Sequence, residues 1–235
     1  MKRMRLARLA LVAVLAGLGG CASLGPTHYY QLDGGNVRAP ASKDRGVAVW
    51  IESLQLADYL QRDVLLERQP DGSLATTRDH WAGPLNANMR QLLQRQLASR
   101  LNSGRVVVGE PPEGFEPQYR LELNVTRLDA GDRAAAVLDA GWQLRDAQGK
   151  LLDTQVVHLQ ARHAGDRAAQ VRAQGDLLQQ LAARLATDLT KVAQRSRRDS
   201  ETARKEPKKL VEEAQAKPTL PAVVPIRTGA EVYRF

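Results

Sequence analysis

The feature that most constrains this chain is its only cysteine, Cys21, because of what precedes it. Four basic residues occur among the first eight positions, an apolar run follows from Leu9 to Leu18, and two glycines stand directly before the cysteine. A basic region, an apolar region and small residues before a cleavage point are the parts of a secretory signal. The apolar run is far shorter than the ~20 residues that span a bilayer. We therefore expect residues 1–20 to be a signal peptide that is removed and takes no part in the fold.

A cysteine directly after such a signal is typical of bacterial lipoproteins, so Cys21 is the predicted lipidation site. The mature chain would begin there with N-acyl and S-diacylglycerol groups, and two or more acyl chains hold a protein stably on a membrane surface. Residue 22 is alanine rather than the aspartate that signals retention at the inner membrane, which favours the periplasmic face of the outer membrane in a Gram-negative envelope. With one cysteine, no intramolecular disulfide can form, and no other cofactor is expected.

The formal net charge of +8 comes from the two ends of the chain. Residues 1–20 hold four basic and no acidic residues, and residues 195–235 hold ten basic and six acidic residues. The segment between them carries equal numbers of basic and acidic residues. Because a basic surface is what binds phosphate backbones, this neutral body argues against a nucleic-acid partner.

The hydrophobic periodicity predicts an α+β domain over residues 46–194. Short β-rich runs and alternation predict strands at 46–51 and 105–108, a hairpin over 62–77 and an antiparallel meander over 118–162. Apolar residues spaced three and four apart predict one amphipathic helix from Pro84 to Leu101 and a second over 167–194. We expect an antiparallel or mixed sheet of about six strands with both long helices packed on it, as a two-layer sandwich.

Two flanking segments are expected to differ from the domain. Residues 21–45 form the predicted lipidated tether, in which the aromatic run 27–32 is either a first strand or a docking segment, the strand being favoured. Residues 195–235 are charged and poor in apolar residues over most of their length, so we expect a disordered tail. Its apolar, aromatic end leaves open a docking peptide as well as a solvated tail.

Catalytic and metal-binding patterns are missing from the sequence. His158 and His163 are five residues apart, which suits a shared metal on neither a strand nor a helix. The chain has no Gly-rich phosphate loop, no His-Glu-x-x-His pair and no Gly-x-Ser-x-Gly elbow. We therefore expect a non-catalytic protein with no metal site.

The polar candidates are Arg62, Arg78 and Trp81. Arginine and tryptophan are enriched where protein interfaces gain most of their binding energy, so all three are predicted partner-binding residues. Two alternatives stay open: Trp81 packs the start of the first helix against the sheet, or the arginines pair with Asp63 and Asp79 as ordinary ion pairs.

Several short motifs occur in a fixed order after Cys21. They are Tyr30-Gln31-Leu32, then Tyr59-Leu60-Gln61-Arg62, then Trp81-Ala82-Gly83-Pro84-Leu85 opening the first helix. In this order and spacing, over about residues 21–194, the chain resembles the PqiC-like ABC-type transport auxiliary lipoproteins. The charged segment after residue 194 departs from the compact pattern of that family.

The resemblance implies a role that composition does not show. Such proteins accompany MCE-type lipid-transport systems, in which an MCE-domain protein anchored in the inner membrane crosses the periplasm. The lipoprotein is then expected to tether or receive that transporter at the outer membrane and to support envelope integrity, and a homo-oligomeric ring is one form it could take there. The alternatives are a periplasmic lipid carrier and an assembly factor for an outer-membrane complex.

Overall fold

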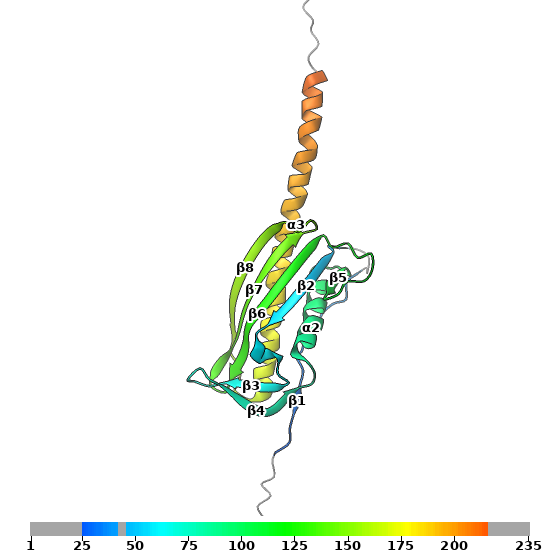
Figure 1. Ribbon diagram of the computed structural model, residues 1–235. Coiled ribbons are helices and arrows are strands. Elements are labelled where there is room, and N and C mark those ends of the chain that lie inside the picture. The colour runs from blue at the N-terminus through cyan, green and yellow to red at the C-terminus, as the bar shows by residue number, and fades with distance from the viewer. Residues whose placement is uncertain (1–24, 42–45, 216–235) are drawn as a thin grey trace, which may run out of the picture. The chain divides into compact units, whose positions relative to one another are not determined.

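A computed structural model describes residues 25–41 and 46–215 (Figure 1). The chain divides into two compact units, one ending at Ala186 and the other beginning at Thr187. The predicted signal peptide and Cys21 lie outside the described residues. The elements in chain order are β1 (Tyr29–Tyr30), β2 (Val49–Leu56), the 3-10 helix η1 (Asp58–Gln61), β3 (Val64–Arg68), β4 (Leu74–Trp81), α2 (Leu85–Arg100), β5 (Val106–Val108), β6 (Tyr119–Gly131), β7 (Ala134–Asp146), β8 (Leu151–Ala161) and α3 (Arg167–Gln215).

A five-stranded mixed sheet forms the body of the first unit, in the order β5-β2-β6-β7-β8. Strand β2 runs parallel to β5 and to β6, whereas β6, β7 and β8 form an antiparallel meander. The meander predicted over 118–162 is therefore confirmed. Alternate residues of β6 and β7 face the core, and Leu121, Leu123, Leu138 and Leu144 are all fully buried, as expected for strands that are wet on one face.

A three-stranded sheet, β1-β4-β3, lies at one end of the larger sheet (Figure 1). Strands β3 and β4 form the predicted hairpin, and Gly72 supplies the positive φ of 88° that its turn requires. Strand β1 pairs with β4 in parallel, with Tyr29 opposite His80 and Tyr30 opposite Trp81. The aromatic run 27–32 thus contains a first strand, which was the favoured alternative.

Both helical segments of the first unit cover the same face of the five-stranded sheet (Figure 1). Helix α2 begins after Pro84, and its predicted apolar stripe is buried: Met89, Leu92, Leu93 and Leu97 have no exposed surface. The part of α3 that precedes residue 187 buries Leu178, Leu181 and Leu185. Because both helices lie on one side, the opposite face of the sheet is left without a helical cover.

Part of the predicted tether is folded onto the domain. Leu32 is 4% exposed, and the Gln96 side-chain amide of α2 donates a hydrogen bond to the carbonyl of Gly34. A Cβ atom added at Gly175 of α3 would lie 3.0 Å from the carbonyl oxygen of Asp33, so a side chain there would push this segment away. Residues 32–35 therefore pack against α2 and α3 instead of hanging free.

The α+β class, the mixed sheet and the two helices are confirmed, and two expectations about extent are corrected. The described residues form eight strands in two sheets rather than about six in one, because β1, β3 and β4 pair among themselves. Helix α3 continues to Gln215, beyond the predicted end at residue 194 and into the predicted disordered tail. Residues 195–215 are rich in Arg, Lys and Glu, which favour helix as strongly as their charge favours solvation.

Candidate partner-binding surface

The three predicted partner-binding residues do not form one surface. Trp81 is 8% exposed, so its indole belongs to the core next to the start of α2, in agreement with the packing alternative. Arg62 and Arg78 are exposed on the three-stranded sheet and the turn before it. Cys21 lies outside the described residues, so its lipidation stays a prediction.

The ion pairs considered for the two arginines do not form among the described residues. The carboxylate of Asp63 lies 3.9 Å from His80 Nδ1. The carboxylate of Asp79 lies 3.3 Å from His28 Nδ1 and 3.5 Å from Arg167 Nε. The acidic neighbours are thus taken by other partners, which leaves the guanidinium groups of Arg62 and Arg78 facing solvent.

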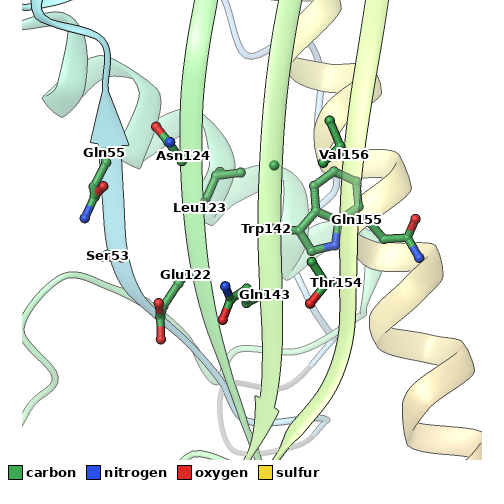
Figure 2. Close-up of a pocket in the computed structure, with 11 residues that line it drawn as sticks. Ser53, Gln55, Glu122, Leu123, Asn124, Trp142, Gln143, Thr154, Gln155 and Val156 are labelled. Carbon is green, nitrogen blue, oxygen red and sulfur yellow. The ribbon is translucent and has the colours of Figure 1, made fainter.

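The uncovered face of the five-stranded sheet, here called the outer face, carries rows of polar side chains across four strands. Strand register places Ser53, Glu122, Gln143 and Thr154 side by side, and places Gln55, Asn124, Gly141 and Val156 in the next row. Figure 2 shows these residues on β2, β6, β7 and β8. Most of the side chains are amides or hydroxyls, and Val156, 81% exposed, is the large apolar exception.

A shallow hollow of about 330 Å³ lies in the middle of the outer face. Gly141, one of its lining residues, contributes no side chain to its row and so leaves the backbone of β7 uncovered there. The hollow is open and its rim is mostly polar and uncharged. Such a surface suits hydrogen bonding to the main chain or side chains of another protein.

The outer face continues toward one end of the sheet with an aromatic and cationic row. The guanidinium carbon of Arg120 lies 5.3 Å from the ring centroid of Trp50, and the indole Nε1 donates a hydrogen bond of 2.6 Å to the Gly109 carbonyl. In the next strand Arg145 Nε lies 3.2 Å from Glu122 Oε1. Tryptophan and arginine held in fixed positions are typical of the residues that anchor protein interfaces.

A buried ionic network joins the two sheets where β3 meets β6. The carboxylate of Asp129, 1% exposed, accepts hydrogen bonds from Arg68, from Arg127 at 3.0 Å and from the Tyr59 hydroxyl at 3.2 Å. The Tyr59 hydroxyl in turn accepts the backbone N–H of Leu128 at 3.0 Å. Burial by itself raises the pKa of Asp129, but the hydrogen bonds and charges of the two arginines outweigh it and hold that pKa below its usual value.

His158 and His163, which lie five residues apart, make separate contacts. His158 contacts Asp139 on the outer face, whereas His163 bonds the carbonyl of Ala134 at 2.8 Å, so the two rings serve separate contacts. Within residues 25–41 and 46–215 there is no group of three or more potential metal ligands.

Sequence reasoning missed the outer face as a candidate site. The signal was the alternation of β6, which correctly placed Arg120, Glu122 and Asn124 on a wet face. The alternation cannot tell which strands lie next to each other, and so it could not align Trp50 with Arg120 or place Gly141 between Asn124 and Val156.

The chain matches a family model described as the ABC-type transport auxiliary lipoprotein component over residues 30–186. A solved protein described only as uncharacterized is similar at 24% identity, with a TM-score of 0.57 over 69% of this chain and 98% of that one. A protein from Xanthomonas campestris assigned to family model DUF330 is similar at 17% identity, with a TM-score of 0.57 over 69% of this chain and 96% of the other. No curated protein matches the chain. None of the helices in the described ranges has both the length and the apolarity to cross a bilayer.

Proposed function

The chain belongs to the ABC-type transport auxiliary lipoprotein family, and from this membership we propose that it is a non-catalytic, lipid-anchored subunit that holds an MCE-type lipid transporter at the outer membrane. The observation that carries the proposal is the outer face of the five-stranded sheet. It is broad and polar, and both helical segments of the first unit lie on the other side of the sheet (Figure 1).

The composition of the outer face supports a protein partner. Interfaces between proteins that also exist apart are about as polar as the rest of the surface and gain their energy from a few anchored residues. Trp50 and Arg120 are such anchored residues, because the guanidinium group of Arg120 lies over the Trp50 ring. Val156 is exposed at the rim of the hollow. A partner that fills the hollow at Gly141 would find amide and hydroxyl groups on adjacent strands.

Anchoring would come from Cys21. Acyl chains on this residue hold the domain at the membrane surface, and the domain then retains its partner by contact alone. A subunit that acts by holding its partner in place needs neither a nucleophile nor a metal. Envelope integrity would depend on it because an unseated transporter cannot deliver or collect lipid.

The proposal extends to a ring of several copies around the end of the transporter. The two edge strands of the five-stranded sheet, β5 and β8, each pair on one side only, and unpaired edges are places where a second chain can add. The mass of the acylated protein in detergent tests this. A monomer at all concentrations would rule the ring out.

Two other functions can be tested with the same protein. A periplasmic lipid carrier needs an apolar space between helix and sheet, but fully buried leucines such as Leu92, Leu93 and Leu123 pack there. Native mass spectrometry of the Cys21→Ser protein would show bound phospholipid if the carrier function held. An assembly factor would instead bind an outer-membrane barrel protein.

Site-specific photocrosslinking in intact envelopes tests the partner directly. A photoreactive amino acid at Asn124 or Val156 samples the outer face, and the same amino acid at Arg172 or Arg184, both exposed on α3, samples the helical side as a matched control. We expect an MCE-domain protein to be captured from positions 124 and 156 and not from 172 or 184. Capture of a barrel protein alone would favour the assembly factor, and equal capture from all four positions would contradict the outer face as the binding surface.

A further inference from the structure

The outward side of the three-stranded sheet presents an aromatic ring on a fixed strand. Tyr29 stands opposite His80 in the parallel β1–β4 pair, so both side chains point to the same face. Their rings are stacked with centroids 5.8 Å apart. Tyr29 is 69% exposed, one of three large apolar side chains exposed among the described residues. Stacking on His80 positions the ring but leaves most of it in solvent.

Two cations without partners accompany this ring. Along β4, Arg78 is exposed two residues before His80, in the part of the strand where its pairing with β3 is irregular. Arg62 is exposed just before β3. In the described ranges no ion pair involves either arginine. The carboxylates of this region are Asp63, which lies 3.9 Å from His80 Nδ1, and Asp79, which contacts His28 and Arg167.

The predicted lipid anchor lies close to this face along the chain. Tyr29 follows Cys21 by eight positions, and even a fully extended chain of this length spans at most about 28 Å. Strands β6 and β7 are 13 residues long and extend over about 43 Å at ~3.3 Å per residue. Because the three-stranded sheet lies at one end of these strands (Figure 1), an anchor at Cys21 holds this end nearest the bilayer.

We propose that Tyr29, Arg62 and Arg78 form a membrane-contact face that lies on the anionic phospholipid headgroups around the anchor. Tyrosine is favoured at membrane interfaces because its ring is apolar and its hydroxyl is polar. Arginine binds phosphate oxygens in pairs of hydrogen bonds and is attracted to an anionic surface. The inference rests on the anchoring proposed for Cys21, and it adds a fixed orientation: the domain meets the membrane through the β1-β4-β3 sheet.

The single cysteine makes a sharp experiment possible. Acylation blocks the sulfur of Cys21, so in the acylated protein Tyr29→Cys introduces the only free thiol, and an environment-sensitive fluorophore attached there reports on this face alone. The protein is reconstituted into vesicles of phosphatidylethanolamine and phosphatidylglycerol, with nitroxide-labelled headgroups as quenchers. A Val156→Cys protein, labelled in the same way on the outer face, is the control.

We expect strong quenching from position 29 and little from position 156. Arg62→Ala/Arg78→Ala should reduce the quenching at position 29 several-fold, whereas the charge-matched Arg172→Ala/Arg184→Ala on α3 should leave it unchanged. Replacing phosphatidylglycerol by phosphatidylcholine, or raising the salt to 0.5 M, should reduce the quenching at position 29 as Arg62→Ala/Arg78→Ala does.

Equal quenching at positions 29 and 156, or no effect of the Arg62 and Arg78 substitutions, would overturn the membrane-contact face while leaving the lipid anchor intact. A second fluorophore on each chain, attached at Cys21, would show a free thiol and would overturn the anchoring itself. The number of labels per chain, read by mass spectrometry, separates these two failures.

Discussion

Asp129 is a buried carboxylate whose charge is balanced by two arginines from different strands. Arg68 comes from β3 and Arg127 from β6, so the network connects the two sheets. Removing the negative charge leaves two guanidinium groups beside a site that is 1% exposed. We expect Asp129→Asn to lower the free energy of unfolding by about 3 kcal/mol, the cost of breaking a buried ion pair. Urea denaturation measures it, and Asp132→Asn, at an exposed position nearby, is the control.

The same network predicts a pH dependence. The pKa of Asp129 in the folded protein is below the usual 3.8, so the ionised group contributes stability above pH 3.8 that is lost as the pH falls toward the folded pKa. The difference in unfolding free energy between wild type and Asp129→Asn should therefore shrink below pH 3.8. A difference that stays constant from pH 7 to pH 2 would show that the charge of Asp129 is not what stabilises the junction.

The raised pKa of Tyr59 predicts that stability is lost as the pH rises, opposite in direction to the effect of Asp129. Burial, aided by the nearby Asp129 charge, raises the pKa of Tyr59 to about 12, so its neutral form stabilises the fold below pH 10 and this contribution is lost between pH 10 and 12. We expect Tyr59→Phe to cost about 1–2 kcal/mol at pH 7, since the Leu128 N–H loses its acceptor. The difference in unfolding free energy between wild type and Tyr59→Phe should diminish above pH 10. The hydroxyl of Tyr30 makes no hydrogen bond within the described residues, so Tyr30→Phe is the control. It should change the free energy of unfolding neither at pH 7 nor above pH 10.

At the scale of elements, the contact between β3 and β6 is too close for any side chain. A Cβ atom added at Gly131 would lie 2.1 Å from the carbonyl oxygen of Arg68, whereas one added at Gly141 would meet its nearest neighbour at 3.4 Å. We expect Gly131→Ala to force the sheets apart and to destabilise the protein by about 3 kcal/mol. Gly141→Ala should be nearly neutral for stability.

The two glycine substitutions also separate folding from binding. Gly141→Ala fills the floor of the outer-face hollow, so it should weaken partner capture from position 156 while the thermal unfolding midpoint stays within a few degrees. If Gly141→Ala unfolded as readily as Gly131→Ala, the hollow would be a packing feature of the sheet and not a free surface.

At the scale of the whole molecule, the proposed lipid anchor at Cys21 predicts where in the envelope the protein is found. We expect Cys21→Ser to remove the acyl groups and to release the protein from the membrane fraction. Ala22→Asp should keep the anchor but move the protein to the inner membrane, because aspartate after the cysteine is the retention signal. Separation of the two membranes on a sucrose gradient measures both. Ala22→Ser is the control, and an Ala22→Asp protein that stayed in the outer membrane would contradict the proposed route.

The elements themselves were largely predictable because their causes are local. The spacing of Met89, Leu92, Leu93 and Leu97 predicts a helix wherever the chain places it, and the alternation from Tyr119 to Val125 predicts a half-buried strand. The end of α3 was missed because a charged, Ala- and Gln-containing sequence is compatible with both solvated coil and helix. For the candidate site, Arg62 and Arg78 are exposed and Trp81 lies in the core, in agreement with the packing alternative, whereas partner binding by these residues stays a prediction.

The sequence alone predicted the anchor signal at Cys21, which stays a prediction, and the periodicity of nearly every element, since both depend on neighbours along the chain. Only the tertiary structure decided that β1, β3 and β4 form a second sheet, that Asp129 meets Arg68 across the junction, and that Trp50, Arg120 and the Gly141 hollow share one face. These are contacts between residues 50 or more positions apart or rows set by strand register. No local pattern encodes such contacts, because they depend on which strands become neighbours when the apolar faces are buried.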